Sequence, residues 1–353
     1  MQIVKIIENN KTKQPHKLQL LFFTLFLMFC MLVFAIYPQT YIPTAKNGIL
    51  LFANNVLPSL FPFFIFTKLL IQLHVLEFDN LKTNACTYKI FGLPSSCLYI
   101  FILSILSGYP VSAKLIADLK NEKKLSKDEV IRCLALCSTS GPVFILGTVG
   151  FTFLANLTAG VILLASHILA SLTNGIVFRK FTAKDVKNDS KNSNLPQQNC
   201  NKIKNLNQST SILEAFSTSI LESIRSILVV GGYIILFFIM IQILQNTYIL
   251  YPLQQLLKAI CNALDIPADY ANALLSGTLE LTRGCAELAT LPNFHISLLC
   301  ISALLGWSGI SILMQSLHFL KNCKIKARHF LLVKSVQCIL NILYCGLLLF
   351  IFC

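Results

Sequence analysis

The sequence predicts an all-α polytopic membrane protein, with about seven transmembrane helices, two re-entrant hairpins and an inverted internal repeat that contains broken helices. Three observations support this fold class. The 353-residue chain is 55% hydrophobic with a mean hydropathy of +0.68, outside the range of soluble domains. Its apolar runs approach or reach the length of about 20 residues that spans a bilayer. Breaks of similar sequence recur in both halves of the chain.

The net charge of +14 comes from 29 basic and 15 acidic residues. The basic residues lie in short segments between the apolar runs, as the positive-inside rule describes. We therefore interpret them as topology signals and expect a lipid bilayer, not a nucleic acid, as the partner. The 13 cysteines are scattered and mostly lie in apolar segments. This pattern indicates small buried side chains in a reducing compartment rather than a disulfide framework.

The first half is predicted to comprise a cytoplasmic tail with the first helix, residues 1–44, and a first repeat unit, residues 45–181. The first apolar run is too long for a signal peptide and has no small-x-small cleavage site after it. The expected elements are, in order, span one at 18–37, a loop at 38–55, span two at 56–73, a polar loop at 74–96, a re-entrant segment at 97–119, span three at 133–150 and span four at 153–178.

Residues 182–210 are rich in Asn, Lys, Ser and Gln, which predicts a flexible cytoplasmic linker. The second repeat unit, residues 211–353, follows it. Its expected elements are an amphipathic helix at 212–225, span five at 226–244, a segment poor in positive charge at 248–273, a second re-entrant segment at 274–292, span six at 294–320 and span seven at 330–352. With the lysine-rich loops inside, the N-terminus is cytoplasmic and the C-terminus is outside.

The two units match at an offset of about 170 residues. Three separate matches keep nearly this offset: 61–73 over 232–244, 106–108 over 275–277 and 140–141 over 308–309. Each unit has three crossings, an odd number, so the second copy is expected to be inverted. Inverted repeats with discontinuous helices form many secondary transporters. The alternative is a chance alignment of two apolar sequences.

Two breaks lie close together in the first unit, at residues 107–110 and 138–142. Unwound backbone at membrane depth persists only where it lines a cavity or is buried in protein. Helices that start after each break would expose free N–H groups and a partial positive charge, so the breaks predict an anion site. A proline kink satisfied by neighbouring hydroxyls is the alternative. The candidate substrate-binding residues at the breaks are Ser107, Gly108, Tyr109, Ser138, Thr139, Ser140, Gly141 and, in the second unit, Ser308.

Charged residues near the breaks complete the candidate site. Lys114, one turn past Pro110, either supplies positive charge to the cavity or extends to the cytoplasmic headgroups. Glu280, Arg283 and Glu287 share one helix face at i, i+3 and i+7. Arg283 is a candidate substrate contact, and Glu280 and Glu287 are candidates for a coupling ion or proton. The alternative is a structural triad that neutralises itself.

Other polar residues in the apolar runs are assigned structural roles. Glu222 and Arg225 are expected to form an interfacial ion pair, and His167 and His318 to be packing or interfacial residues. No metal-binding pair, phosphate-binding loop or nucleophile elbow occurs in the sequence. We therefore expect no enzyme activity, no cofactor and no metal. Without ATP hydrolysis, any transport would be driven by an ion gradient or by the substrate gradient.

Four motifs carry a resemblance to a known family, namely 107–114 (SGYPVSAK), 137–147 (CSTSGPVFILG), 279–284 (LELTRG) and 306–309 (GWSG). With these motifs the chain resembles the sporulation integral membrane proteins of the YlbJ type, which contain nucleoside-recognition or "gate" repeats. The likeness extends over nearly the whole chain after about residue 40. The chain departs from the family at Ser112, where glycine is more frequent, at Ser138 and Thr139, where an Asn pair is usual, and at Arg283, where a small polar residue or Asn is common.

The resemblance implies a multi-pass protein of the mother-cell-derived outer forespore membrane that carries dipicolinic acid during spore formation. A small planar dianion of this kind fits a site made of helix N-termini and basic residues. Two alternatives stay open: a cation-coupled nucleoside transporter and a sporulation membrane scaffold without transport activity. A homo-oligomer is also left open.

Overall fold

The computed structural model describes residues 17–72, 81–109, 111–182, 212–323 and 325–352. Within these ranges the chain is helical and contains no β-strand, which confirms the predicted all-α class. The helices of the first half are α2 (Lys17–Ile36), α3 (Pro38–Leu51), the π-helix η1 (Phe52–Val56), α4 (Leu57–Gln72), α5 (Leu81–Phe91), α6 (Ser95–Ser107), α7 (Val111–Asn121), α8 (Lys127–Cys137), the π-helix η2 (Val143–Phe153) and α9 (Leu157–Thr182).

The second half repeats a similar order of long and broken helices. They are α11 (Ile212–Asn246), α12 (Tyr251–Ala263), α13 (Asp269–Leu279), α14 (Leu281–Ala289), α15 (Phe294–Trp307), α16 (Gly309–Leu320), the 3₁₀-helix η3 (Lys321–Cys323) and α17 (Ala327–Phe352). The linker predicted at 182–210 lies outside the described residues, apart from its first residue.

Among the described residues, five helices are long and apolar enough to cross a membrane. They are Pro38–Leu70, Leu157–Lys180, Ile212–Asn246, Phe294–Cys323 and Ala327–Phe352. Helices α5 and α6 form a sixth candidate, bent by 74°. The count of seven crossings stays a prediction, because the apolar part of α2 is short and 133–150 is divided between α8 and η2. Large apolar side chains on the outer faces of α11 and α17 are exposed, as lipid-facing residues are.

Two segments that the sequence analysis treated as loops are helical. Residues 38–56 form α3 and η1, which continue into α4, so span two begins at residue 38 and not at residue 56 as predicted. Pro38 at the first helical position suits a helix start. The polar loop predicted at 74–96 contains α5, which packs against α6 and α9. Packing in the bundle therefore stabilises helix in segments of modest hydrophobicity.

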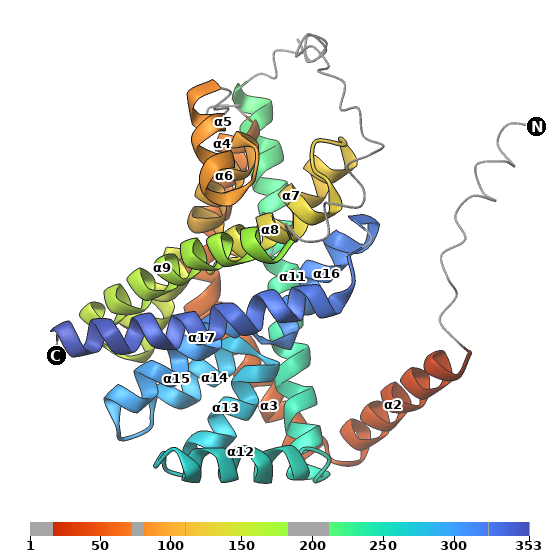
Figure 1. The fold of residues 1–353 in the computed structure, drawn as a ribbon. Coiled ribbons are helices and arrows are strands. Elements are labelled where there is room, and N and C mark those ends of the chain that lie inside the picture. The colour runs from red at the N-terminus through yellow and green to blue at the C-terminus, as the bar shows by residue number, and fades with distance from the viewer. Residues whose placement is uncertain (1–16, 73–80, 110, 183–211, 324, 353) are drawn as a thin grey trace, which may run out of the picture.

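Long helices of the two halves lie next to each other. Helix α9 packs along α17, and α4 packs along α11 (Figure 1). The short helices α6, α7 and α8 share one apolar core with α16, while η2, α13, α14 and α15 share another with α9 and α17. The broken helices therefore contribute to two apolar cores, the second of which includes the long helices α9 and α17.

Candidate functional site

The two breaks of the first half touch each other. Helix α6 ends at Ser107, and Gly108 follows with φ = 69°. A Cβ atom at Gly108 would lie 2.5 Å from the nitrogen of Gly141, which belongs to the break between α8 and η2. The absence of a side chain at Gly108 thus allows the two backbones to meet. We call this contact, residues 107–109 against 138–141, the first crossing.

The breaks of the second half form a second crossing, residues 279–281 against 307–309. A Cβ atom at Gly309 would lie 3.0 Å from the nitrogen of Leu281. The indole nitrogen of Trp307 donates a hydrogen bond to the carbonyl of Thr278 at 3.1 Å. Each half therefore contains two broken helices whose breaks touch.

The re-entrant break of the second half lies three residues later than its sequence predicted. The internal repeat aligned Ser276 and Gly277 with the first break, but α13 continues to Leu279. Gly277 lies inside this helix, where a Cβ atom would collide with Leu304. The chain interrupts its helix at Glu280, whose carboxylate accepts the backbone N–H of Arg283 at 2.7 Å and caps α14. Glycine here serves close packing, and the capping residue determines the break.

The two crossings share a small cavity of about 50 Å³, which we call the crossing cavity. Helices α7, η2, α14 and α16 all begin around it, so four helix N-termini surround one space. Its lining comprises Ser107, Gly108, Tyr109, Ser140 and Gly141 of the first crossing, Glu280, Leu281 and Thr282 of the second, and Val56, Leu60, Phe144, Val230, Ile234, Ser311, Ile312 and Gln315 from adjoining helices.

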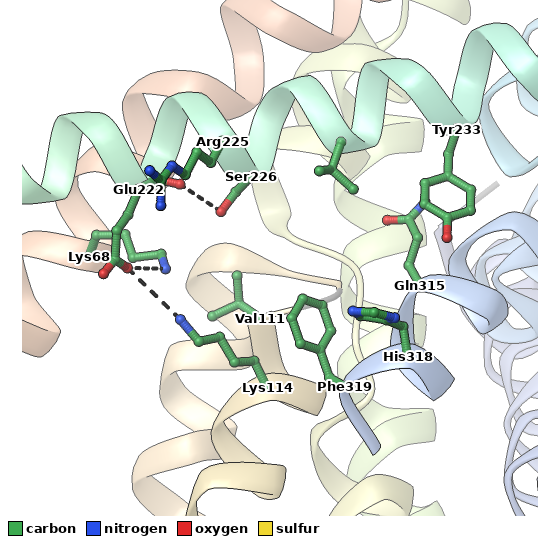
Figure 2. Close-up of a pocket in the computed structure, with 11 residues that line it drawn as sticks. Lys68, Val111, Lys114, Glu222, Arg225, Ser226, Tyr233, Gln315, His318 and Phe319 are labelled. Carbon is green, nitrogen blue, oxygen red and sulfur yellow. Dashed lines mark hydrogen bonds and ion pairs between the residues drawn. The ribbon is translucent and has the colours of Figure 1, made fainter. Parts of the chain in front are cut away.

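A larger cavity of about 480 Å³, the basic pocket, adjoins the crossing cavity at Gln315, which lines both. Its volume lies in the range of small-molecule sites. Figure 2 shows Lys68 and Lys114 near the carboxylate of Glu222 at one end, and Tyr233, Gln315 and His318 at the other. The remaining lining residues are Val111, Arg225, Ser226, Val229 and Phe319.

The basic pocket contains more positive than negative charge. Glu222 accepts a hydrogen bond from Lys68 at 2.8 Å, and the Nζ atom of Lys114 lies 3.9 Å from the same oxygen. The expected Glu222–Arg225 ion pair is thus replaced by contacts with lysines on α4 and α7, which packing brings to α11. Lys68, Lys114 and Arg225 give three cations against one carboxylate in this pocket. Such an excess favours an anionic ligand.

Arg283 is not among the residues that line these two cavities. Its Nε atom donates to Glu287 at 2.7 Å, and its Nη1 atom donates to the carbonyl of Phe238 at 3.1 Å. The guanidinium also lies 5.2 Å from the centre of the Phe238 ring. These contacts connect α14 to α11. Of the predicted acidic candidates, Glu280 lines the crossing cavity and Glu287 pairs with Arg283.

Three further predicted residues are buried behind the cavity lining. The Thr139 hydroxyl donates to the hydroxyl of Ser104 at 3.2 Å, and the Ser138 carbonyl accepts a hydrogen bond from Lys334 at 2.7 Å. Ser308 has φ = 70°, and its hydroxyl donates to the carbonyl of Trp307 at 2.5 Å. Their contacts hold the broken segments in place.

The structure adds a polar face of α17 that the sequence analysis missed. Lys334, Gln337 and Asn341 are each fully buried and point toward the first crossing. His167 of α9 joins them: its Nε2 atom accepts the backbone N–H of Ser140 at 2.9 Å, and its Nδ1 atom lies 3.0 Å from the Asn341 amide nitrogen. His167 therefore has a defined role in holding the break.

A sequence signal for this face was present. Lys334, Gln337 and Asn341 follow the spacing i, i+3 and i+7 within an apolar span, so they share one side of the helix. Polar residues within a span usually face the protein interior. The described part of the chain contains no cluster of three or more His, Cys, Asp or Glu side chains that could hold a metal ion.

Comparison with known proteins identifies a relative. Over 331 residues the chain is 26% identical to the "Sporulation integral membrane protein YlbJ" of Bacillus subtilis (strain 168), a match that covers 91% of this chain and 80% of that protein. No protein-family model and no solved structure matches the chain. The match agrees with the four motifs, and the apolar helices agree with a membrane location. The chain is therefore a multi-pass integral membrane protein that is similar to a YlbJ-type sporulation membrane protein over most of its length.

Proposed function

We propose that the protein is a secondary transporter that moves dipicolinic acid across the outer forespore membrane during sporulation. The observation that carries the proposal is the basic pocket, in which three cations oppose one carboxylate next to a cavity surrounded by four helix N-termini. Dipicolinate is a flat ring with two carboxylates. Lysine and arginine side chains with helix N-termini bind carboxylates, and the aromatic residues Tyr233 and Phe319 offer apolar surface to a ring.

The arrangement of helices supports a carrier mechanism. The series α4, α6–α7, α8–η2 and α9 is followed by α11, α13–α14, α15–α16 and α17, as in an inverted repeat. Carriers built in this way expose a central site to each side in turn by moving one unit against the other. The basic pocket adjoins the end of α16, just before Lys321, on the side of the lysine-rich loops. In our proposal it admits substrate from the mother-cell cytoplasm, and the crossing cavity is the constriction that opens next.

The proposed site differs in part from the one predicted from sequence. Lys114 belongs to the basic pocket, and Ser107, Gly108, Tyr109, Ser140 and Gly141 belong to the crossing cavity. Lys68 and Arg225 are added to the site. Ser138, Thr139 and Ser308 support the backbone, and we propose that Arg283 does so as well. The mechanism includes no enzymatic step and no cofactor.

The dipicolinate content of spores tests the proposal. Deletion of the gene is expected to yield spores depleted of dipicolinate, and Lys114→Ala to yield partial depletion because one of the three cations is lost. Lys46→Ala, which changes an exposed lysine on α3 that lines neither cavity, is the matched control. Normal dipicolinate in the deletion strain would refute the proposed substrate.

Uptake into proteoliposomes separates the competing functions. The purified protein is expected to take up labelled dipicolinate and to be inhibited by other small planar dicarboxylates, whereas uptake of labelled nucleosides alone would favour the nucleoside transporter. A variant lacking residues 182–210 should retain uptake if the chain is a carrier. If instead that deletion blocks sporulation while the protein shows no uptake of either substrate, the scaffold alternative is supported.

A further inference from the structure

The ammonium group of Lys334 lies at the first crossing, completely buried. It is on α17, and its Nζ atom donates to the carbonyl of Ser138 at 2.7 Å, to Oε1 of Gln337 at 3.2 Å and to the hydroxyl oxygen of Tyr109 at 3.3 Å. The same atom lies 4.4 Å from the centre of the Tyr109 ring. The centre of the Phe330 ring lies 6.0 Å away, so three oxygens and two aromatic rings surround the ammonium.

These contacts match the hydrogen-bonding capacity of the charged form of the lysine. The carbonyl of Ser138 and the amide oxygen of Gln337 can only accept hydrogen bonds. The Tyr109 hydroxyl donates its own proton to the carbonyl of Leu305 at 3.0 Å, so it faces Lys334 as an acceptor. Three acceptors match the three N–H donors of an ammonium, whereas a neutral amine has two. The aromatic ring adds a cation–π contact.

The charge is balanced by dipoles rather than by a carboxylate. None of the ion pairs among the described residues includes Lys334. Ser138 is the C-cap of α8, so its carbonyl lies at the negative end of that helix. The titratable side chains close to Lys334 are Tyr109 and, through Ser140, His167. Carbonyl, amide and hydroxyl oxygens at the C-terminal end of a half-helix are the ligands with which broken-helix carriers bind sodium.

We propose that Lys334 is a tethered cation that occupies, at the first crossing, the place of a bound alkali metal ion. The lysine supplies permanently the positive charge that holds the end of α8 against Tyr109, so the protein needs no sodium ion at this crossing. This inference concerns the folded protein and does not depend on the substrate. Its consequence for transport, that uptake does not require sodium, rests on the proposed function.

Thermal unfolding of the full-length protein in detergent tests the inference without any substrate. Wild-type protein is expected to have the same unfolding midpoint in sodium chloride and in choline chloride at equal ionic strength. Lys334→Ala removes the ammonium and leaves its oxygen ligands, so it should unfold at a lower temperature in choline chloride. Sodium should bind the vacated site and raise the midpoint by roughly 2–4 °C.

Two further variants serve as controls. Lys334→Met replaces the ammonium by an apolar side chain of similar length, so sodium should not raise its midpoint. Lys68→Ala removes the other buried lysine described here, which pairs with Glu222, and should also show no sodium-specific gain. A sodium-induced rise in the wild type, or its absence in Lys334→Ala, would overturn the inference. If Lys334→Ala fails to fold, the wild-type comparison still decides: equal midpoints support the tethered cation and a sodium-specific rise refutes it.

Discussion

The substitution Gly108→Ala probes the close contact on which the first crossing depends. Gly108 has φ = 69° and ψ = −162°, a backbone region that essentially only glycine occupies. An added Cβ atom would lie 2.5 Å from the nitrogen of Gly141 and 3.1 Å from its Cα atom. Both are backbone atoms, so no side-chain rotation can relieve the collision.

Two costs contribute to the expected effect. The strained backbone conformation costs about 1–3 kcal/mol for a residue with a side chain, and overpacking in a close contact costs about 1–3 kcal/mol. We therefore expect the free energy of unfolding to fall by roughly 2–6 kcal/mol. Relief of the collision would also separate the two breaks, so dipicolinate uptake by the protein that remains folded should fall.

The matched control is Gly232→Ala in α11, where an added Cβ atom has no heavy atom within 4 Å. Alanine is favoured over glycine inside a helix by about 0.5–1 kcal/mol, so this variant should unfold at or slightly above the wild-type temperature. A thiol-reactive fluorophore can follow unfolding, because most of the described cysteines are buried until the bundle opens. If Gly108→Ala unfolds at the wild-type temperature and retains full uptake, the proposed close crossing is incorrect.

Three other substitutions test the assigned roles of charged and polar residues. Lys114→Gln should weaken the apparent affinity for dipicolinate about tenfold in uptake assays, because a charge-assisted contact worth about 1.5 kcal/mol is lost; an unchanged affinity would exclude Lys114 from the site. Arg283→Ala should lower the free energy of unfolding by about 2–3 kcal/mol through loss of its contacts with Glu287 and α11, whereas a selective loss of affinity would support the substrate contact predicted from sequence. His167→Ala should cost about 1–3 kcal/mol, because it leaves the buried Ser140 N–H without its acceptor; an unaltered thermal midpoint would contradict this role.

Much of the fold could be predicted from local sequence. Long apolar runs without charge must become helices in lipid, since every backbone N–H and C=O group needs an internal partner. Gly108 and the Ser140–Gly141–Pro142 run interrupt two such segments, and the structure breaks both helices there. The sequence also predicted a break at Gly277, but the helix continues through it. A glycine inside a helix and a glycine at a break have the same local sequence pattern. Only the packing partner Leu304 distinguishes them.

The sequence by itself thus determined the class of protein, most of its long helices and the two breaks in the first half, because these depend on hydrophobicity and on residues with special backbone preferences. The tertiary structure decided which charges meet. Glu222 contacts Lys68 and Lys114, which are far away in the chain, and Lys334 reaches the carbonyl of Ser138 across 196 positions. Such contacts depend on which helix faces pack together, and a side chain's neighbours in a bundle are not encoded in its own segment.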